Sequence, residues 1–181
     1  MSYTLDSKDS LISKLILGSA QFGNHYGISN QYGVTDEDEI KKILSFAFRN
    51  GIRKIDTAIE YGISENRIGT FIKDEMDIIT KIPRIPNSIS RKEINNWLQE
   101  KIESSLKNLK SENVYAILLH STEDLNKKNG NQLFDCLIEL REKGIAKFIG
   151  YSIYDTEELE TIYHKYDPDL VQIPMNIVDN R

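Results

Sequence analysis

Short runs of apolar residues alternate along this chain with segments that are apolar on one face only. The runs are brief, rich in isoleucine, leucine and valine, and mostly without polar alternation, which is typical of strands covered on both faces of a sheet. Six of them are expected to be strands: 14–18, 52–56, 76–80, 114–119, 145–151 and 170–174.

Segments with apolar residues at helical spacing lie between these runs. Thr35 is expected to cap a helix that Gly51 closes, and Ser90 with Glu93 is expected to form a capping box for another. The repeats that define these two helical faces are Ile40, Ile43, Leu44, Ala47 and Phe48, and then Ile94, Trp97, Leu98, Ile102, Leu106 and Leu109.

Three further helices complete the alternation. A short helix is expected around 65–73, and another carries Leu133, Phe134, Leu137 and Leu140 before Gly144. Asp155 is expected to cap a last helix, with apolar positions Leu159, Ile162, Tyr163 and Tyr166, that ends before Pro168.

The order of strands and helices predicts an α/β fold with a parallel sheet. No linker or change of composition divides residues 14–181, which are expected to form one domain after an N-terminal extension, 1–13. The glycines after the first run, Gly18 and Gly23, lack the G-x-G-x-x-G spacing of the open dinucleotide-binding fold. The parallel (β/α)8 barrel of the TIM-barrel type is therefore the preferred architecture.

Charge and composition argue against several classes of function. A net charge of −5 argues against nucleic-acid binding, which needs a basic face. The single cysteine, Cys136, cannot form an internal disulfide, and three histidines without an H-x-H pair argue against a metal-dependent barrel hydrolase. No signal-peptide core or membrane-spanning run is present in this sequence, so a cytoplasmic location away from membranes is expected.

Four residues suited to proton transfer lie near the ends of the predicted strands. Asp56 closes one apolar run, Lys81 and His120 directly follow two others, and Tyr61 lies five residues beyond Asp56. The carboxyl ends of parallel strands lie on one side of the sheet, so these residues are expected to converge there. Singly, each fits an ordinary structural role: a capping carboxylate, a loop aromatic, a solvated strand end and a loop histidine.

Together, the four residues match the needs of carbonyl reduction. A tyrosine donates a proton to the developing alkoxide, and a lysine beside it is expected to lower the tyrosine pKa. An aspartate holds the lysine, and an imidazole orients the carbonyl oxygen. Tyr61, Lys81, Asp56 and His120 supply these groups in turn.

The sequence IDTAIEYGISENRIG at 55–69 resembles the signature of the aldo-keto reductase superfamily, in which four residues separate the aspartate from the tyrosine. Five further motifs agree in order, so the resemblance covers residues 14–181: LILGSAQFG at 15–23, TK at 80–81, LLH at 118–120, GYS at 150–152 and VQIPMN at 171–176.

This resemblance implies an oxidoreductase that reduces an aldehyde or ketone with NADP or NAD and uses no metal. It implies that Asp56, Tyr61, Lys81 and His120 are catalytic, with Tyr61 as the proton donor. Many relatives have asparagine after the serine of the GYS motif, where this chain has Ile153. The cofactor-binding residues implied are Gly18, Ser19, Asp56, Ser152, Gln172 and Asn176.

The barrel is expected to be incomplete, because only about six of its eight strands fit within 181 residues. The first and sixth strands are then open edges through which the chain could self-associate. Three interpretations stay open: a truncated fragment of a reductase, an inactive remnant, and a chain completed by another chain. A non-catalytic regulatory or interaction protein that keeps the aldo-keto reductase fold is the alternative function.

Overall fold

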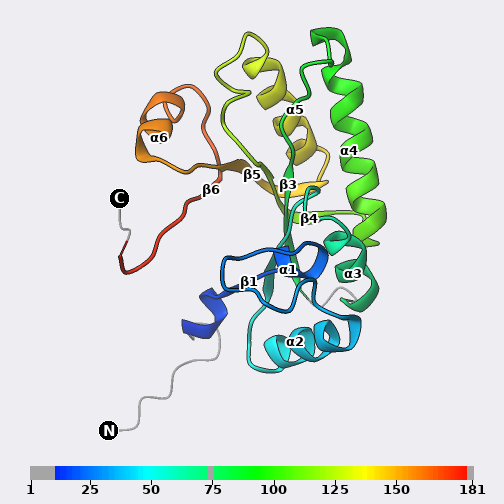
Figure 1. Cartoon of the computed structure of the whole chain (residues 1–181). Coiled ribbons are helices and arrows are strands. Elements are labelled where there is room, and N and C mark those ends of the chain that lie inside the picture. The colour runs from blue at the N-terminus through cyan, green and yellow to red at the C-terminus, as the bar shows by residue number, and fades with distance from the viewer. Residues whose placement is uncertain (1–10, 73–75, 179–181) are drawn as a thin grey trace, which may run out of the picture.

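The computed structural model describes residues 11–72 and 76–178. Six parallel strands form one sheet in the order β1-β2-β3-β4-β5-β6. The sheet curls, and helices α2 to α5 pack along its outer side (Figure 1). This arrangement confirms the α/β fold and the incomplete (β/α)8 barrel.

All six predicted strands are present, and each strand end lies within two residues of its predicted position. They are β1 (Ile16–Gly18), β2 (Lys54–Asp56), β3 (Asp77–Ile82), β4 (Val114–Leu119), β5 (Ala146–Ser152) and β6 (Leu170–Gln172). The third strand continues through Lys81, which therefore lies within the strand and not after it.

Helices connect successive strands, as the alternation predicted. The α-helices are α1 (Ala20–Gly23), α2 (Glu37–Arg49), α3 (Ser64–Phe71), α4 (Ile94–Leu109), α5 (Gly130–Glu142) and α6 (Thr156–Ile162), and the short 3-10 helices are η1 (Leu11–Lys14) and η2 (Arg91–Glu93). No helix in 11–72 or 76–178 is long and apolar enough to cross a membrane.

Two of the expected helix ends were wrong in detail. Asp36, not Thr35, caps α2, because its carboxylate accepts from the Glu39 backbone N–H at 2.9 Å. The last helix begins after Asp155 as predicted but ends at Ile162, four residues before Tyr166. The Ser90–Glu93 capping box is confirmed, and it encloses the 3-10 turn η2 directly before α4.

The main hydrophobic core lies between the sheet and the helices that cover its outer side. It contains Ile55, Ile117 and Ile149 from three strands, with Ile68 and Leu137 from α3 and α5. A second, smaller cluster belongs to the central strands and consists of Ile79, Ala116 and Leu118. The central strands are therefore covered on both faces, which explains their continuous apolar sequences.

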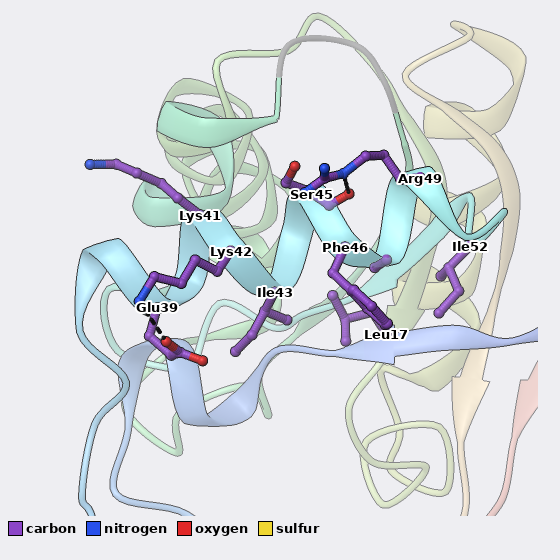
Figure 2. Close-up of a pocket in the computed structure, with 10 residues that line it drawn as sticks. Leu17, Glu39, Lys41, Lys42, Ile43, Ser45, Phe46, Arg49 and Ile52 are labelled. Atoms are coloured by element: carbon purple, nitrogen blue, oxygen red, sulfur yellow. Dashed lines mark hydrogen bonds and ion pairs between the residues drawn. The ribbon is translucent and has the colours of Figure 1, made fainter.

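The two outer strands are the exposed part of the fold. Each of β1 and β6 pairs with a neighbour on one side only, and Ile16 and Ile173 are 47% and 46% exposed. A groove of about 740 Å³ lies between α2 and β1, where Ile43 and Phe46 point toward Leu17 (Figure 2). The barrel thus leaves apolar surface uncovered along its β1 side.

We expect this surface to make the chain associate with itself as its concentration rises, because an open strand edge offers unpaired backbone groups to another chain. Replacing Ile16 by lysine should reduce association, since a charge on an edge strand disfavours strand pairing. Ile28→Lys is the control, because Ile28 is fully exposed and lies in a loop. Sedimentation velocity tests this, and equal association of both variants and the parent would contradict it.

Candidate active site

The carboxyl ends of β2, β3 and β4 bring the four expected catalytic residues together. Asp56 is the last residue of β2, Lys81 is the fifth residue of β3, and His120 directly follows β4. Tyr61 lies in the turn between β2 and α3, where its backbone N–H donates to the Ala58 carbonyl at 3.0 Å. The convergence predicted from the strand order is therefore present.

A buried ion pair joins Lys81 to Asp56. The Lys81 ammonium donates to both carboxylate oxygens, at 2.7 and 2.8 Å, and to the Thr57 carbonyl at 2.9 Å. The Lys81 side chain is only 2% exposed. Burial lowers the Lys81 pKa, and the Asp56 carboxylate opposes this effect. All three ammonium protons have acceptors, so this side chain is held in one position.

Tyr61 lies against this ion pair, with the Lys81 ammonium 5.1 Å from its ring centroid. The expectation that Lys81 lowers the Tyr61 pKa was wrong: burial, followed by the Asp56 carboxylate, raises it to about 12. Burial disfavours the charged phenolate, and the Asp56 carboxylate places a negative charge near it. Tyr61 therefore keeps its proton at neutral pH.

This raised pKa predicts a late ionisation of one phenol. The difference in phenolate absorbance between the parent and Tyr61→Phe reports the ionisation of Tyr61. We expect this difference to have its midpoint near pH 12, two pH units above the ordinary pKa of 10.0. Because folding raises this pKa, the resulting contribution to stability is complete below pH 10 and lost as the pH rises through 12. Ultraviolet titration with parallel circular dichroism measures both, and a difference midpoint near 10 would contradict the prediction.

Close backbone packing sets the position of the Tyr61 turn. A Cβ atom on Gly23 would lie 1.8 Å from the Tyr61 carbonyl oxygen, so only glycine allows α1 to approach the turn this closely. Gly62 has a φ of 58°, and a Cβ there would lie 2.5 Å from the Gly23 carbonyl oxygen. The end of α1 therefore supports the turn that carries Tyr61.

His120 completes the group at the rim. Its ring contacts the Tyr61 ring edge-on, with centroids 5.7 Å apart and an interplanar angle of 77°. Its Nδ1 lies 3.0 Å from a Glu60 carboxylate oxygen, a close contact without a hydrogen bond. Burial and the Lys81 charge lower the His120 pKa, while Glu60 and Asp56 oppose them. The imidazole therefore lies between positive and negative groups.

The residues expected to bind a cofactor lie around the same end of the sheet. Gly18 pairs in register with Asp56, and Ser152 pairs with Gln172. The Gln172 amide nitrogen donates to Asp56 at 3.2 Å, which links β6 to β2 across 116 residues of sequence. This bond spans the inside of the curled sheet, where a cavity of about 330 Å³ is lined by Gly18, Asp56 and Gln172 among others.

The six expected cofactor residues differ in what their side chains can still bind. The Gln172 amide oxygen is buried without a hydrogen-bond partner among the described residues, so it can accept from a ligand. Ser19 is fully buried and its hydroxyl already donates to the Asp56 carbonyl at 2.8 Å. Ser152 is buried at the end of β5, and Asn176 is exposed beyond β6. Ile153 is buried, as suits its apolar side chain.

Two acidic residues near the site were not singled out from the sequence. Glu60 contacts His120, and Glu65 is buried and accepts from the hydroxyls of Thr80 and Ser105 at 2.7 and 2.6 Å. The Glu65 contact ties α3 to the strand that carries Lys81. Glu65 lies in the SE pair of the family signature, whereas nothing in the local sequence distinguishes Glu60.

The comparison with protein families agrees with this geometry. The model of the aldo/keto reductase family matches residues 14–181. The chain belongs to the aldo/keto reductase family. Enzymes of this family are oxidoreductases of carbonyl compounds and generally use NADH or NADPH.

Relatives of this aldo/keto reductase chain are longer than the chain itself. It is 26% identical over 168 residues to the chloroplastic pyridoxal reductase of Arabidopsis thaliana, and 29% identical over 157 residues to the D-arabinose 1-dehydrogenase of Saccharomyces cerevisiae. These matches cover 84% and 79% of this chain but 44% and 43% of the relatives. The chain thus spans less than half the length of these two proteins.

A solved structure supports the fold. The holo form of an aldo-keto reductase from Bacillus halodurans superposes with a TM-score of 0.71 at 18% identity, covering 89% of this chain and 53% of that one. The partial barrel therefore has the same arrangement as part of a larger reductase.

Proposed function

We propose that this chain carries the carbonyl-reducing site of a nicotinamide-dependent oxidoreductase, in which Tyr61 donates the proton. The observation that supports this most directly is the buried Lys81–Asp56 pair against the Tyr61 ring, with His120 on the neighbouring strand end. An acid, an amine, a phenol and an imidazole within one cluster provide both a proton and the charges that stabilise its transfer.

The proton moves from Tyr61 to the oxygen of the reduced carbonyl group. A phenol with a pKa of about 12 still protonates an alkoxide, because the conjugate alcohol is about as weak an acid as water and so a weaker acid than this phenol. The Lys81 ammonium is held by Asp56 and lies 5.1 Å from the centroid of the ring that carries the resulting phenolate. His120 is next to Tyr61 and orients the carbonyl oxygen.

The residues at this end of the sheet fit the nicotinamide end of NADP or NAD, which supplies the hydride when bound. The unpartnered Gln172 oxygen suits the N–H of a carboxamide, and Ser152 lies beside Gln172 on the adjacent strand. Asn176 follows on the same segment, and Gly18, Ser19 and Asp56 form the opposite side. Ser19 acts there through the Asp56 backbone, since its hydroxyl is already bonded.

A direct test combines cofactor binding with turnover. The 181-residue chain is titrated with NADPH and with NADH by nicotinamide fluorescence, and is then given a panel of small aldehydes and ketones. We expect quenching or enhancement with at least one cofactor and aldehyde-dependent loss of nicotinamide absorbance. Failure to bind either cofactor would contradict the proposal and leave the non-catalytic interaction protein as the better interpretation.

A further inference from the structure

Glu60 occupies a position that the proposed reaction does not use. It directly precedes Tyr61, and its backbone carbonyl accepts from the Asn24 side chain at 3.0 Å, which holds the turn in place. Its carboxylate lies 3.0 Å from Nδ1 of His120, with side-chain exposures of 55% for Glu60 and 18% for His120. A carboxylate therefore faces one nitrogen of the imidazole from the solvent side.

The chemistry of this contact restricts the proton on His120. An ionised carboxylate only accepts hydrogen bonds, so the nitrogen facing it is favoured to carry a proton. A neutral imidazole has a single ring proton, and a proton on Nδ1 leaves Nε2 as an acceptor. Nε2 then donates only when the ring is doubly protonated and positively charged. The Glu60 carboxylate lies 3.0 Å from Nδ1, so its negative charge acts on that nitrogen even without a hydrogen bond.

We propose that Glu60 is a positioning residue whose carboxylate keeps a proton on His120 Nδ1, so that Nε2 can donate to a carbonyl oxygen only when His120 is positively charged. The consequence for catalysis rests on the proposed function. The proton distribution on His120 does not, because it follows from the contact with Glu60 alone.

Three charged groups act on the His120 charge from the elements around it. Lys81 on β3 disfavours the imidazolium, while Asp56 on β2 and Glu60 in the following turn favour it. The Tyr61 ring covers one side and keeps its proton at neutral pH. Glu60 is the most exposed of the three charged groups, so its removal disturbs the packing least.

Nuclear magnetic resonance of the chain labelled with ¹⁵N-histidine tests the proposal without any activity. Ring ¹⁵N shifts distinguish the two neutral tautomers, and His120→Asn identifies its signals among those of His25 and His164. We expect the proton of neutral His120 on Nδ1 in the parent, and a shift toward the Nε2 tautomer in Glu60→Ala. Glu60→Gln keeps an acceptor but removes the charge, so the titration midpoint should fall by roughly 0.5 pH.

Glu123→Gln is the matched control, because Glu123 is 60% exposed and pairs with Arg84 instead. Equal midpoints in Glu60→Gln and Glu123→Gln, or an Nε2 proton in the neutral parent, would overturn the proposal. In an active preparation, the alkaline limb of the pH–rate profile for carbonyl reduction should move to lower pH in Glu60→Gln. The size of this change should equal the change in the His120 titration midpoint. If the Glu60 variants change the His120 tautomer but not this limb, Glu60 controls the His120 proton and has no role in catalysis.

Discussion

Replacing Tyr61 by phenylalanine is expected to lower the rate of carbonyl reduction by roughly 10²–10⁴-fold, the usual effect of removing a general acid. The reason is that, among residues 11–72 and 76–178, Tyr61 is the phenol that lies against the Lys81–Asp56 pair. The Tyr61 hydroxyl makes no hydrogen bond within the part of the chain that the structure describes, so its removal leaves no buried partner unsatisfied. Stability and cofactor affinity should therefore change little.

Three measurements on this variant separate the chemical role from a structural one. Turnover with an aldehyde, nicotinamide fluorescence titration and thermal unfolding are compared with those of Tyr32→Phe, whose ring is almost fully exposed. A loss of cofactor affinity as large as the loss of turnover would make Tyr61 a binding or structural residue. Unchanged turnover would remove it from the reaction.

Replacing Lys81 by methionine is expected to destabilise the fold by about 3–5 kcal/mol, because it leaves the Asp56 carboxylate without its buried counter-charge. Lys81 is 2% exposed and Asp56 is 14% exposed, so water replaces little of the lost interaction. Such a loss is a large part of the ~5–15 kcal/mol that stabilises an ordinary domain. Urea unfolding followed by circular dichroism measures it, and carbonyl reduction should be lost as well.

An exposed ion pair provides the control for Lys81→Met. Lys42 pairs with Glu39 on α2 with side-chain exposures of 74% and 50%, and Lys42→Met should cost at most about 1 kcal/mol. The double variant Lys81→Met/Asp56→Asn should recover part of the stability, since the uncompensated charge is gone. Equal costs for the two lysine variants would show that the buried pair does not support the fold.

Local patterns were sufficient to predict the strands and the positions of the reactive groups. A strand that is covered on both faces must be apolar at nearly every position, so its end is visible where the sequence becomes polar. Asp56 and His120 lie at such boundaries, whereas β3 continues one residue past Lys81, and parallel strands place all three residues at one rim. The short range of these signals also explains the precise capping box at Ser90 and Glu93.

Competition between neighbouring groups was not visible in the same patterns. Thr35 and Asp36 are both acceptable N-cap residues, and Asp36 is the one that caps α2. The Thr35 carbonyl instead accepts a hydrogen bond from the distant Arg67 side chain at 2.7 Å. The Tyr61 pKa depends on burial and on a carboxylate that also binds Lys81. These effects depend on distances in space, which sequence spacing does not supply.

The sequence by itself therefore determined the βα order, the family and the residues that reach the rim. Only the tertiary structure decided that Gln172 reaches Asp56 across the curled sheet, and that Glu60 faces His120. The physical reason is that a strand's end can be read from its own residues, because hydrophobic burial acts at every position along it. The curl of the sheet and the direction of each side chain arise from packing between distant segments, and these set which charges meet.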